Sequence, residues 1–258
     1  MSADPAVVAA LRVAGCVFAE DEARLIAAAA RTPEQTAAMV ARRSAGEPLE
    51  HVVGFAEFAG LRIGVGPGVF VPRRRTEFLA RQAAALLPAR GAVVLDLCCG
   101  SGAVGAFLAA SAEGVELHAA DVDPAAVACA RGNVAAAGGK VHQGDLFAPL
   151  PAALRGRVDV LAANVPYVPS GAIGLLPAEA RDHEARVALD GGADGLDVLR
   201  RVAAEARGWL AAGGSLLSET SQEQAPLALA ALRAGGLAAR EVTDEEMGAT
   251  VVIGTRPA

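Results

Sequence analysis

Several residue types are scarce in this sequence of 258 residues, and each shortage narrows what the protein can do. Lysine occurs once, at Lys140, and the formal net charge is −6 with a pI near 5.3. Basic residues gather only at Arg73-Arg74-Arg75, whereas a protein that grips a nucleic-acid backbone presents a broad basic face. We therefore expect no direct, sequence-specific binding to nucleic acid.

Cysteine and long apolar runs are also in short supply. Cys16, Cys98, Cys99 and Cys129 lack metal-ligand spacing, so we expect no metal site and reduced thiols, as in the cytosol. No apolar run reaches the roughly 18 residues of a membrane span, and no basic segment precedes the first apolar stretch after Met1. These absences predict a cytoplasmic protein without a signal peptide or membrane contact, which we expect to be a monomer.

The chain divides by composition into three parts, with boundaries near residues 48 and 75. Residues 1–48 are rich in alanine and carry helix-start signals at Asp4-Pro5 and Thr32-Pro33-Glu34, which predicts two or three short helices. Between His51 and Val71, apolar residues alternate with glycine, a pattern typical of a hairpin. From Thr76 onward strands alternate with helices, which predicts an α/β fold with a doubly wound, mostly parallel sheet.

The periodicity of this third part predicts its individual elements. The expected strands are Val93–Leu97, Val115–Ala120, Lys140–His142, Val158–Ala163, Ser215–Ser218 and final strands that end at Val251–Ile253. The expected helices lie at about 76–87, up to about 111, after Asp123-Pro124, at about 194–211 and near 222–235. Proline and glycine predict a loop between the Val158 strand and the helix that follows it.

A glycine-rich turn follows the first of these strands and points to a nucleotide-like ligand. Gly100, Gly102 and Gly105 satisfy G-x-G-x-x-G, and Asp121 lies 21 residues after Gly100, as in a dinucleotide site. Asp96 favours another ligand, because its carboxylate would repel a pyrophosphate but suits an amino group and a sulfonium. S-adenosylmethionine is such a ligand, and NAD is the alternative. Asp121 then suits the ribose hydroxyls and Asp145 the adenine.

The tetrapeptide Asn164-Val165-Pro166-Tyr167 follows the Val158 strand, at the sheet edge where open α/β folds bind their ligands. It suits a planar NH2 group as substrate. Asn164 offers its side-chain carbonyl, Val165 its main-chain carbonyl and Tyr167 an aromatic face. The two carbonyls would orient the nitrogen toward a methyl donor, and orientation alone can lower a barrier by about 7 to 11 kcal/mol.

Four further matches make a family resemblance specific. The tetrapeptide resembles Asn-Pro-Pro-Tyr, and Phe70 to Glu77 resembles V-L-I-P-R-P-E-T-E. The run Ala188 to Asp197 is similar to A-L-x-G-G-x-D-G-L-D, and Gly213 to Glu219 resembles G-G-x-L-x-x-E. Together with the glycine turn, these motifs resemble the protein-(glutamine-N5) methyltransferases, the HemK/PrmC-like release factor glutamine methyltransferase family. The resemblance covers about residues 50 to 258.

The resemblance implies a class I methyltransferase sheet of seven strands in residues 76–258, a Rossmann-like fold that binds S-adenosylmethionine. It implies a helical substrate-recognition segment in residues 1–48 and a β-hairpin linker in residues 49–75. The implied acceptor is a glutamine amide in a protein, either the Gly-Gly-Gln loop of a release factor or a ribosomal protein.

The resemblance also assigns residues to roles. The catalytic residues are Asn164, Val165, Pro166 and Tyr167. The cofactor-binding residues are Asp96, Cys98, Cys99, Gly100, Ser101, Gly102, Asp121, Val122, Asp145, Leu146 and Asn164. The substrate-binding residues are Phe70, Pro72, Arg73, Thr76 and Glu77.

The sequence departs from the family pattern in four places. Val165 replaces the first motif proline, Arg74-Arg75 replace Pro-Glu of P-R-P-E-T-E, and Cys98-Cys99 replace Gly-Thr. The usual E-I-G-x-x-Q is Glu219 to Gln224 here. Two alternatives remain open: an N-methyltransferase that acts on an exocyclic amino group of a nucleic-acid base, and an NAD-binding Rossmann protein.

Overall fold

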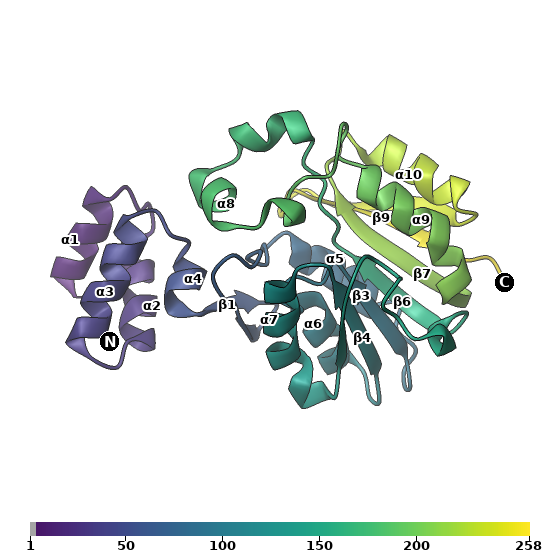
Figure 1. Ribbon diagram of the computed structural model, residues 1–258, viewed down its shortest axis with the longest axis horizontal. Helices are drawn as coiled ribbons and strands as arrows, with labels where there is room; N and C mark the ends of the chain where they lie inside the picture. The colour runs from purple at the N-terminus through teal and green to yellow at the C-terminus, as the bar shows by residue number, and fades with distance from the viewer. Residues whose placement is uncertain (1–3) are drawn as a thin grey trace.

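The computed structural model describes residues 4–258; Met1, Ser2 and Ala3, the start of the expected N-terminal segment, lie outside the described residues. Helices α1 (Pro5–Val13), α2 (Ala19–Ala29) and α3 (Pro33–Ser44) pack together at one end of the molecule (Figure 1). The predicted start signals act as caps, since Asp4 accepts the N–H of Ala6 and Thr32 accepts that of Gln35. These helices share a small core that is separate from the sheet.

The segment expected to form a hairpin also contains a short helix. Helix α4 (Leu49–Val53) precedes β1 (Phe55–Phe58) and β2 (Leu61–Gly64), which pair in antiparallel fashion. Gly54, at φ +83°, ends the helix in the left-handed conformation that glycine favours. The buried ring of His51 lies 2.8 Å from the carbonyl oxygen of Val69, so this helix is held to the segment beyond the hairpin.

In residues 4–258, a seven-stranded sheet has the order β5-β4-β3-β6-β7-β9-β8. Its strands are β3 (Val93–Leu97), β4 (Glu116–Asp121), β5 (Lys140–Gln143), β6 (Val158–Ala163), β7 (Leu210–Thr220), β8 (Ala238–Asp244) and β9 (Ala249–Thr255). Strands β3 to β7 are parallel to one another, and β9 is antiparallel to both β7 and β8. The predicted α/β, mostly parallel sheet is confirmed, with its switch point between β3 and β6.

Helices cover both faces of the sheet, because alternate strand residues point to opposite faces. Val94 belongs to a core with α5 (Thr76–Ala84), α6 (Ala103–Ser111) and α7 (Pro124–Val134). Leu95 belongs to the core of the other face, with α9 (Asp197–Trp209) and α10 (Ala225–Ala234). The strands between these layers carry apolar residues on both faces, as a parallel sheet requires.

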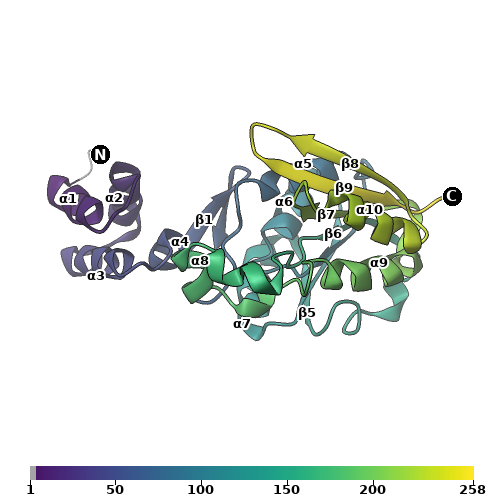
Figure 2. The same ribbon diagram turned by 90° about the horizontal axis from the view of Figure 1, so that it is seen from above.

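The Pro/Gly stretch between β6 and α9, which we predicted to be a loop, contains short helical segments. It contains the short helical turns η3 (Ser170–Leu175) and η4 (Arg186–Ala188) on either side of α8 (Ala178–His183). Figure 2 shows α8 on the side of the sheet that faces the N-terminal helices. Glu179 of α8 pairs with Arg43 of α3 at 2.5 Å, and Ala185 donates a backbone hydrogen bond to Gly68. We call residues 176–189 the roof segment.

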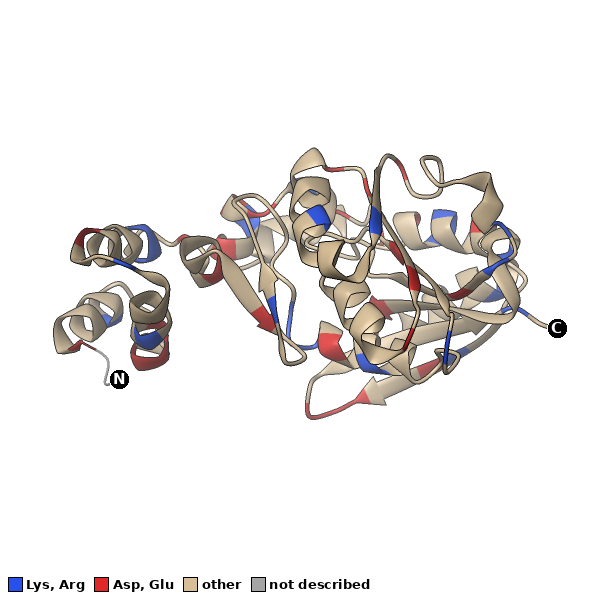
Figure 3. Ribbon diagram, turned by 90° about the horizontal axis from the view of Figure 1, so that it is seen from below, with Lys and Arg blue, Asp and Glu red and all other residues tan. Residues whose placement is uncertain are grey.

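Charges of both signs are interspersed over the ribbon in Figure 3. Among residues 4–258, no helix has the length and apolarity that crossing a bilayer requires. The described part of the chain also contains no cluster of three or more metal-binding side chains. The four cysteines are free thiols, and Cys99 is buried.

Candidate active site

A cavity of about 420 Å³ lies at the carboxyl ends of β3, β4 and β6, beneath the roof segment. It brings together residues that the sequence analysis drew from separate motifs. The predicted residues that line it are Phe70, Pro72, Arg73, Thr76, Asp96, Cys98, Cys99, Gly100, Ser101, Asp121, Val122, Asp145, Leu146, Asn164, Val165, Pro166 and Tyr167. Gly102 and Glu77 do not line it.

The two predicted residues outside the cavity have structural partners. A Cβ atom on Gly102 would lie 3.1 Å from that of Ala130, so this glycine lets the turn approach α7. Glu77 pairs with Arg81 at 2.7 Å along the surface of α5. Both residues therefore make structural contacts with α7 and within α5, and neither lines the cavity.

The turn after β3 adopts a left-handed backbone at Cys98 (φ +54°), Gly100 (φ +54°) and Gly102 (φ +77°). This geometry suits glycine, and Cys98 is strained in it because its Cβ atom meets the following carbonyl. Burial raises the pKa of the Cys98 thiol, so the side chain is a neutral part of the cavity wall.

Asp96 at the end of β3 is buried and accepts the backbone N–H of Gly105 at 2.8 Å. A Cβ atom on Gly105 would lie 3.0 Å from the carboxylate, which explains the third glycine of G-x-G-x-x-G. Gly105 therefore leaves space for the carboxylate of Asp96. Its N–H group, in the first turn of α6, could otherwise bind a phosphate but is hydrogen-bonded to that carboxylate. Burial raises the pKa of Asp96 to about 8.

Asp121 at the end of β4 braces the same turn. Its carboxylate accepts the N–H groups of Gly100 and Asp123, both at 2.9 Å. Asp123 caps α7 by accepting the N–H of Ala125 at 2.8 Å, as predicted. Because Asp123 already caps α7, the carboxylate of Asp121 is left at the cavity wall, where burial raises its pKa.

An ion pair that the sequence did not indicate lies in the lining of the cavity. Arg201 of α9 contacts the carboxylate of Asp145 at 2.6 Å, and both side chains are more than half exposed. Leu146 beside them has φ +47° and is buried. Asp145 is therefore held at the edge of the cavity by a helix on the opposite side of the switch point.

Asn164 provides the most direct sign of a missing ligand. It follows the last residue of β6, and its Oδ1 atom is buried with no hydrogen-bond partner among residues 4–258. An unpaired buried acceptor costs about 1 to 3 kcal/mol, so such an atom calls for a donor that arrives with a ligand. The neighbouring Val165 is 2% exposed.

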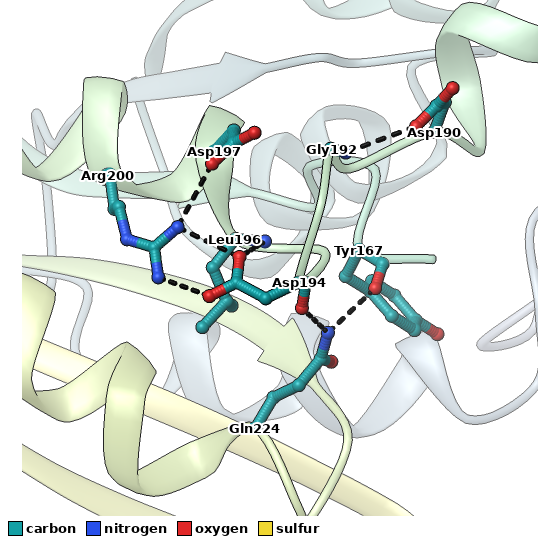
Figure 4. Close-up of polar contacts among 8 residues, drawn as sticks. All are labelled: Tyr167, Asp190, Gly192, Asp194, Leu196, Asp197, Arg200 and Gln224. Carbon is teal, nitrogen blue, oxygen red and sulfur yellow. Dashed lines mark hydrogen bonds and ion pairs between the residues drawn. The ribbon is translucent and has the colours of Figure 1, made fainter. Parts of the chain in front are cut away.

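The glycine-rich run before α9 packs directly on the tetrapeptide (Figure 4). The side-chain amide of Gln224 donates to the carbonyls of Tyr167 and Asp194, both at 2.9 Å, and so ties the two segments together. A Cβ atom on Gly191 would lie 2.6 Å from the Pro166 oxygen. On Gly195 it would lie 2.2 Å from the Tyr167 oxygen. Backbone lies against backbone here, which only glycine permits.

The predicted substrate-side residues anchor the roof segment. Arg73 forms hydrogen bonds of 2.6 Å with both oxygens of Glu184, whose side chain is 1% exposed, and its guanidinium lies 4.7 Å from the Phe70 ring centroid. The N–H of Val71 donates to the same carboxylate at 3.1 Å. Burial raises the pKa of Glu184 and the Arg73 cation opposes this effect.

Sequence reasoning missed several residues of this arrangement. Glu184 and Arg201 gave no signal, because each matters only through a partner more than 50 residues away. Glu219 and Gln224 stood in the segment that resembles the family, so that segment was the available signal. Glu219 is buried and accepts hydrogen bonds from Arg75, Thr76 and Tyr167.

The charges of the residues that line the cavity distinguish between the two candidate ligands, S-adenosylmethionine and NAD. Acids face the cavity at 96, 121 and 145, while Arg73 and Arg201 are engaged by Glu184 and Asp145. An acid-lined cavity suits a ligand with an amino group, a sulfonium and ribose hydroxyls, and it disfavours a pyrophosphate. The residues present therefore fit S-adenosylmethionine better than NAD.

Comparison with known proteins agrees with this chemistry. Residues 61–193 match the family model described as "Methyltransferase small domain". The chain is 41% identical over 203 residues to a release factor glutamine methyltransferase of Mycolicibacterium smegmatis, covering 77% of this chain and 72% of the relative. It is 35% identical over 229 residues to the Geobacter sulfurreducens protein of the same name, covering 87% and 79%.

A relative with a different name is similar to nearly the same degree. It is a 4-amino-L-phenylalanine/4-methylamino-L-phenylalanine methyltransferase of Streptomyces pristinaespiralis, 37% identical over 203 residues, or 76% of this chain and 69% of the relative. Among solved structures, a methyltransferase from Pyrococcus furiosus superposes with a TM-score of 0.57 at 17% identity, covering 78% of this chain and 91% of that one. This likeness shows the fold.

Proposed function

Because the chain belongs to the release factor glutamine methyltransferase family, we propose that it methylates a glutamine of a peptide chain release factor. The methyl group moves from S-adenosylmethionine to the side-chain amide nitrogen. The observation that carries this proposal is the buried, unpartnered Oδ1 atom of Asn164 beside the acid-lined cavity. A primary amide brings the N–H that this acceptor lacks.

S-adenosylmethionine, when bound, supplies an electrophilic methyl group on a sulfonium. Asp96 would face its amino group, Asp121 its ribose hydroxyls, and Asp145 with Leu146 its adenine. The turn from Cys98 to Gly102 would carry the cofactor at the end of β3.

The chain's own contribution to the reaction is orientation. An amide nitrogen is a weak nucleophile because its lone pair is delocalised into the carbonyl. Asn164 Oδ1 and the Val165 carbonyl would accept the two N–H groups, and the Tyr167 ring would lie against the amide plane. A nitrogen–carbon bond would form as the sulfur–carbon bond of the bound donor breaks, and a proton would then leave the methylated nitrogen to water. Holding the reacting atoms in line can supply about 7 to 11 kcal/mol.

We propose that residues 1–48 recognise the protein substrate, that residues 49–75 link them to the sheet, and that residues 76–258 carry the transfer. Exposed apolar side chains support a protein-binding role for the first part: Val13, Val17 and Phe18 are 91%, 83% and 69% exposed. The Arg43–Glu179 pair connects this part to the roof segment. We further propose that the protein is a cytoplasmic monomer. We also propose that it does not bind nucleic acid in a sequence-specific way, and its net charge of −6 supports this last point.

The test is methylation of purified release factor with methyl-labelled S-adenosylmethionine, followed by mass spectrometry of the labelled peptide. We expect label on one glutamine, and none on a release factor in which that glutamine is replaced by asparagine. Parallel reactions contain host RNA, host DNA or 4-amino-L-phenylalanine. Label on a nucleic-acid base or on the free amine, with none on release factor, contradicts the proposal.

A further inference from the structure

Three side chains from distant parts of the chain form a closed triangle of hydrogen bonds at the cavity. Arg75 Nη2 donates to the Tyr167 hydroxyl at 2.6 Å, and that hydroxyl donates to Glu219 Oε1 at 2.8 Å. Arg75 Nε donates to the same Oε1 atom at 2.7 Å. The phenol of the catalytic tetrapeptide is thus held from both sides, through its lone pair and through its proton.

The base of this triangle is rigid. The side chain of Glu219 is 2% exposed, and its second oxygen accepts the Thr76 hydroxyl at 2.6 Å. A buried carboxylate with several charge-assisted hydrogen bonds keeps its position, because breaking any of them leaves charge unpaired in a low dielectric. Glu219 therefore fixes where the Arg75 guanidinium and the Tyr167 hydroxyl can lie.

Arg75 occupies a position that suits arginine poorly for local reasons. It is the N-cap residue of α5, and its side chain makes no capping hydrogen bond. Helix N-termini favour Asp, Asn, Ser or Thr as caps and disfavour positive charge. The P-R-P-E-T-E pattern has an acid at this place. The contacts that account for Arg75 are therefore the tertiary ones to Tyr167 and Glu219.

The second departure lies two residues before Tyr167. In Asn-Pro-Pro-Tyr two proline rings fix the backbone that leads to the tyrosine, whereas here Val165 leaves one of the two φ angles free. Pro166 still biases Val165 toward an extended conformation. Relative to the Asn-Pro-Pro-Tyr pattern, the tetrapeptide lacks one restraint on its backbone. The side chain of Tyr167 is restrained by its hydrogen bonds to Arg75 and Glu219.

Resting on the proposed function, we propose that Arg75 is a positioning residue that clamps Tyr167 and so compensates for Val165 in place of proline. Arg75 acts through the tyrosine: it holds the phenol so that the ring lies where the acceptor amide must be oriented. The two departures form one functional unit, and each should matter less when the other is reversed.

The test combines R75Q, which removes the cation, with V165P and with Y167F, which removes the clamped hydroxyl. We expect R75Q to lower kcat for release factor methylation at least tenfold while the Kd for S-adenosylmethionine changes less than twofold. In the V165P and Y167F backgrounds, the same substitution should cost less than threefold. R75K, which keeps the charge but not the planar fork, should recover part of kcat.

R74Q is the matched control, because it makes the same change at the exposed neighbour, which forms no ion pair among residues 4–258. It should leave kcat within twofold. Equal losses in R74Q and R75Q overturn the proposal, and so does a full R75Q loss in either the V165P or the Y167F background. A kcat within twofold for R75Q overturns it as well.

A readout besides activity separates this proposal from the proposed function. Tyr167 is the single tyrosine of the chain, so ring-labelled ¹³C-tyrosine gives one set of NMR signals. We expect these signals to shift or broaden in R75Q and not in R74Q. If the wild-type protein fails to methylate release factor, the proposed function falls, while unchanged Tyr167 signals in R75Q show that no clamp exists.

Discussion

The backbone N–H of Gly105 donates a hydrogen bond of 2.8 Å to the carboxylate of Asp96. The first turn of α6 thus faces an acid of the chain itself, where a dinucleotide site would leave it open for phosphate. Since burial raises the pKa of Asp96 to about 8, this group is mostly protonated at pH 7 in the protein without ligand. A cationic ligand would favour the ionised form.

The raised pKa makes the stability of the ligand-free protein depend on pH. Asp96 holds its proton in the folded state up to about pH 8 but loses it near its ordinary value of 3.8 when unfolded. Its contribution to stability is therefore present below pH 3.8 and declines as pH rises toward 8, by at most about 1.4 kcal/mol per pH unit.

D96N should remove this decline, because asparagine does not titrate. The measurement is urea unfolding of both proteins at pH 5, 6.5 and 8, with the difference between them taken at each pH. His118 and His142, whose pKa values burial lowers, titrate in both proteins and cancel in the comparison. A difference that stays constant across this range contradicts the assignment.

Replacement of Asn164 should separate turnover from cofactor binding. N164A leaves an acceptor amide with an unpaired N–H, which costs about 1 to 3 kcal/mol, or roughly 5- to 150-fold in rate before misorientation adds to it. N164D keeps an acceptor oxygen and should retain more turnover than N164A. Calorimetry with S-adenosylmethionine should give a Kd close to wild type for N164A. Wild-type turnover by N164A would rule out its role.

The backbone contact at Gly195 should be intolerant of any side chain. A Cβ atom there would lie 2.2 Å from the Tyr167 oxygen, and the glycine has φ +81°. We expect G195A to lower the free energy of unfolding by about 3 kcal/mol or more, through clash and strain together. Gly171 is the control, because a Cβ atom there meets nothing within 4 Å. In thermal melts, G171A should stay close to wild type.

Cys98 should be more stable as glycine than as alanine, whereas the neighbouring Cys99 should be more stable as alanine than as glycine. At φ +54° a glycine avoids a penalty of about 1 to 2 kcal/mol that alanine incurs. C98G should therefore be more stable than C98A. At Cys99, whose φ is not positive, C99A should be more stable than C99G by about 0.4 to 1 kcal/mol, because glycine makes the unfolded chain more flexible. Urea unfolding of the four variants checks this reversal, and the same order at both positions would contradict it.

The sequence predicted those features of the site that depend only on residues close together in the chain. Apolar alternation placed Val158–Ala163 in a strand, and the sheet-edge rule then placed Asn164 at the cavity. The cap at Asp123 followed from the residues around it. These features depend on neighbours in sequence, so a single chain suffices to find them.

Features that depend on remote partners could not be predicted. The roof segment contained only Pro/Gly signals, and its order comes from the ion pairs of Glu179 with Arg43 and of Glu184 with Arg73. Their motifs led us to expect Gly102 and Glu77 in the cavity lining. Instead, Gly102 packs against Ala130 and Glu77 pairs with Arg81, and neither contact can be predicted from the motif. Motif membership identified the segment, and packing decided which residues of it face the ligand.

The triangle at Tyr167 also bears on how the enzyme acquires activity as it folds. Its bonds join residues separated by 92 and 144 positions along the chain, and the Arg73–Glu184 pair spans 111. Contacts of such long range form late, because the entropy of closing the intervening chain opposes them. A nascent chain that ends before Glu219 contains Arg75 and Tyr167 but not the carboxylate that holds both of them. Catalytic competence should thus arise at the end of folding, as an all-or-none property of the finished chain.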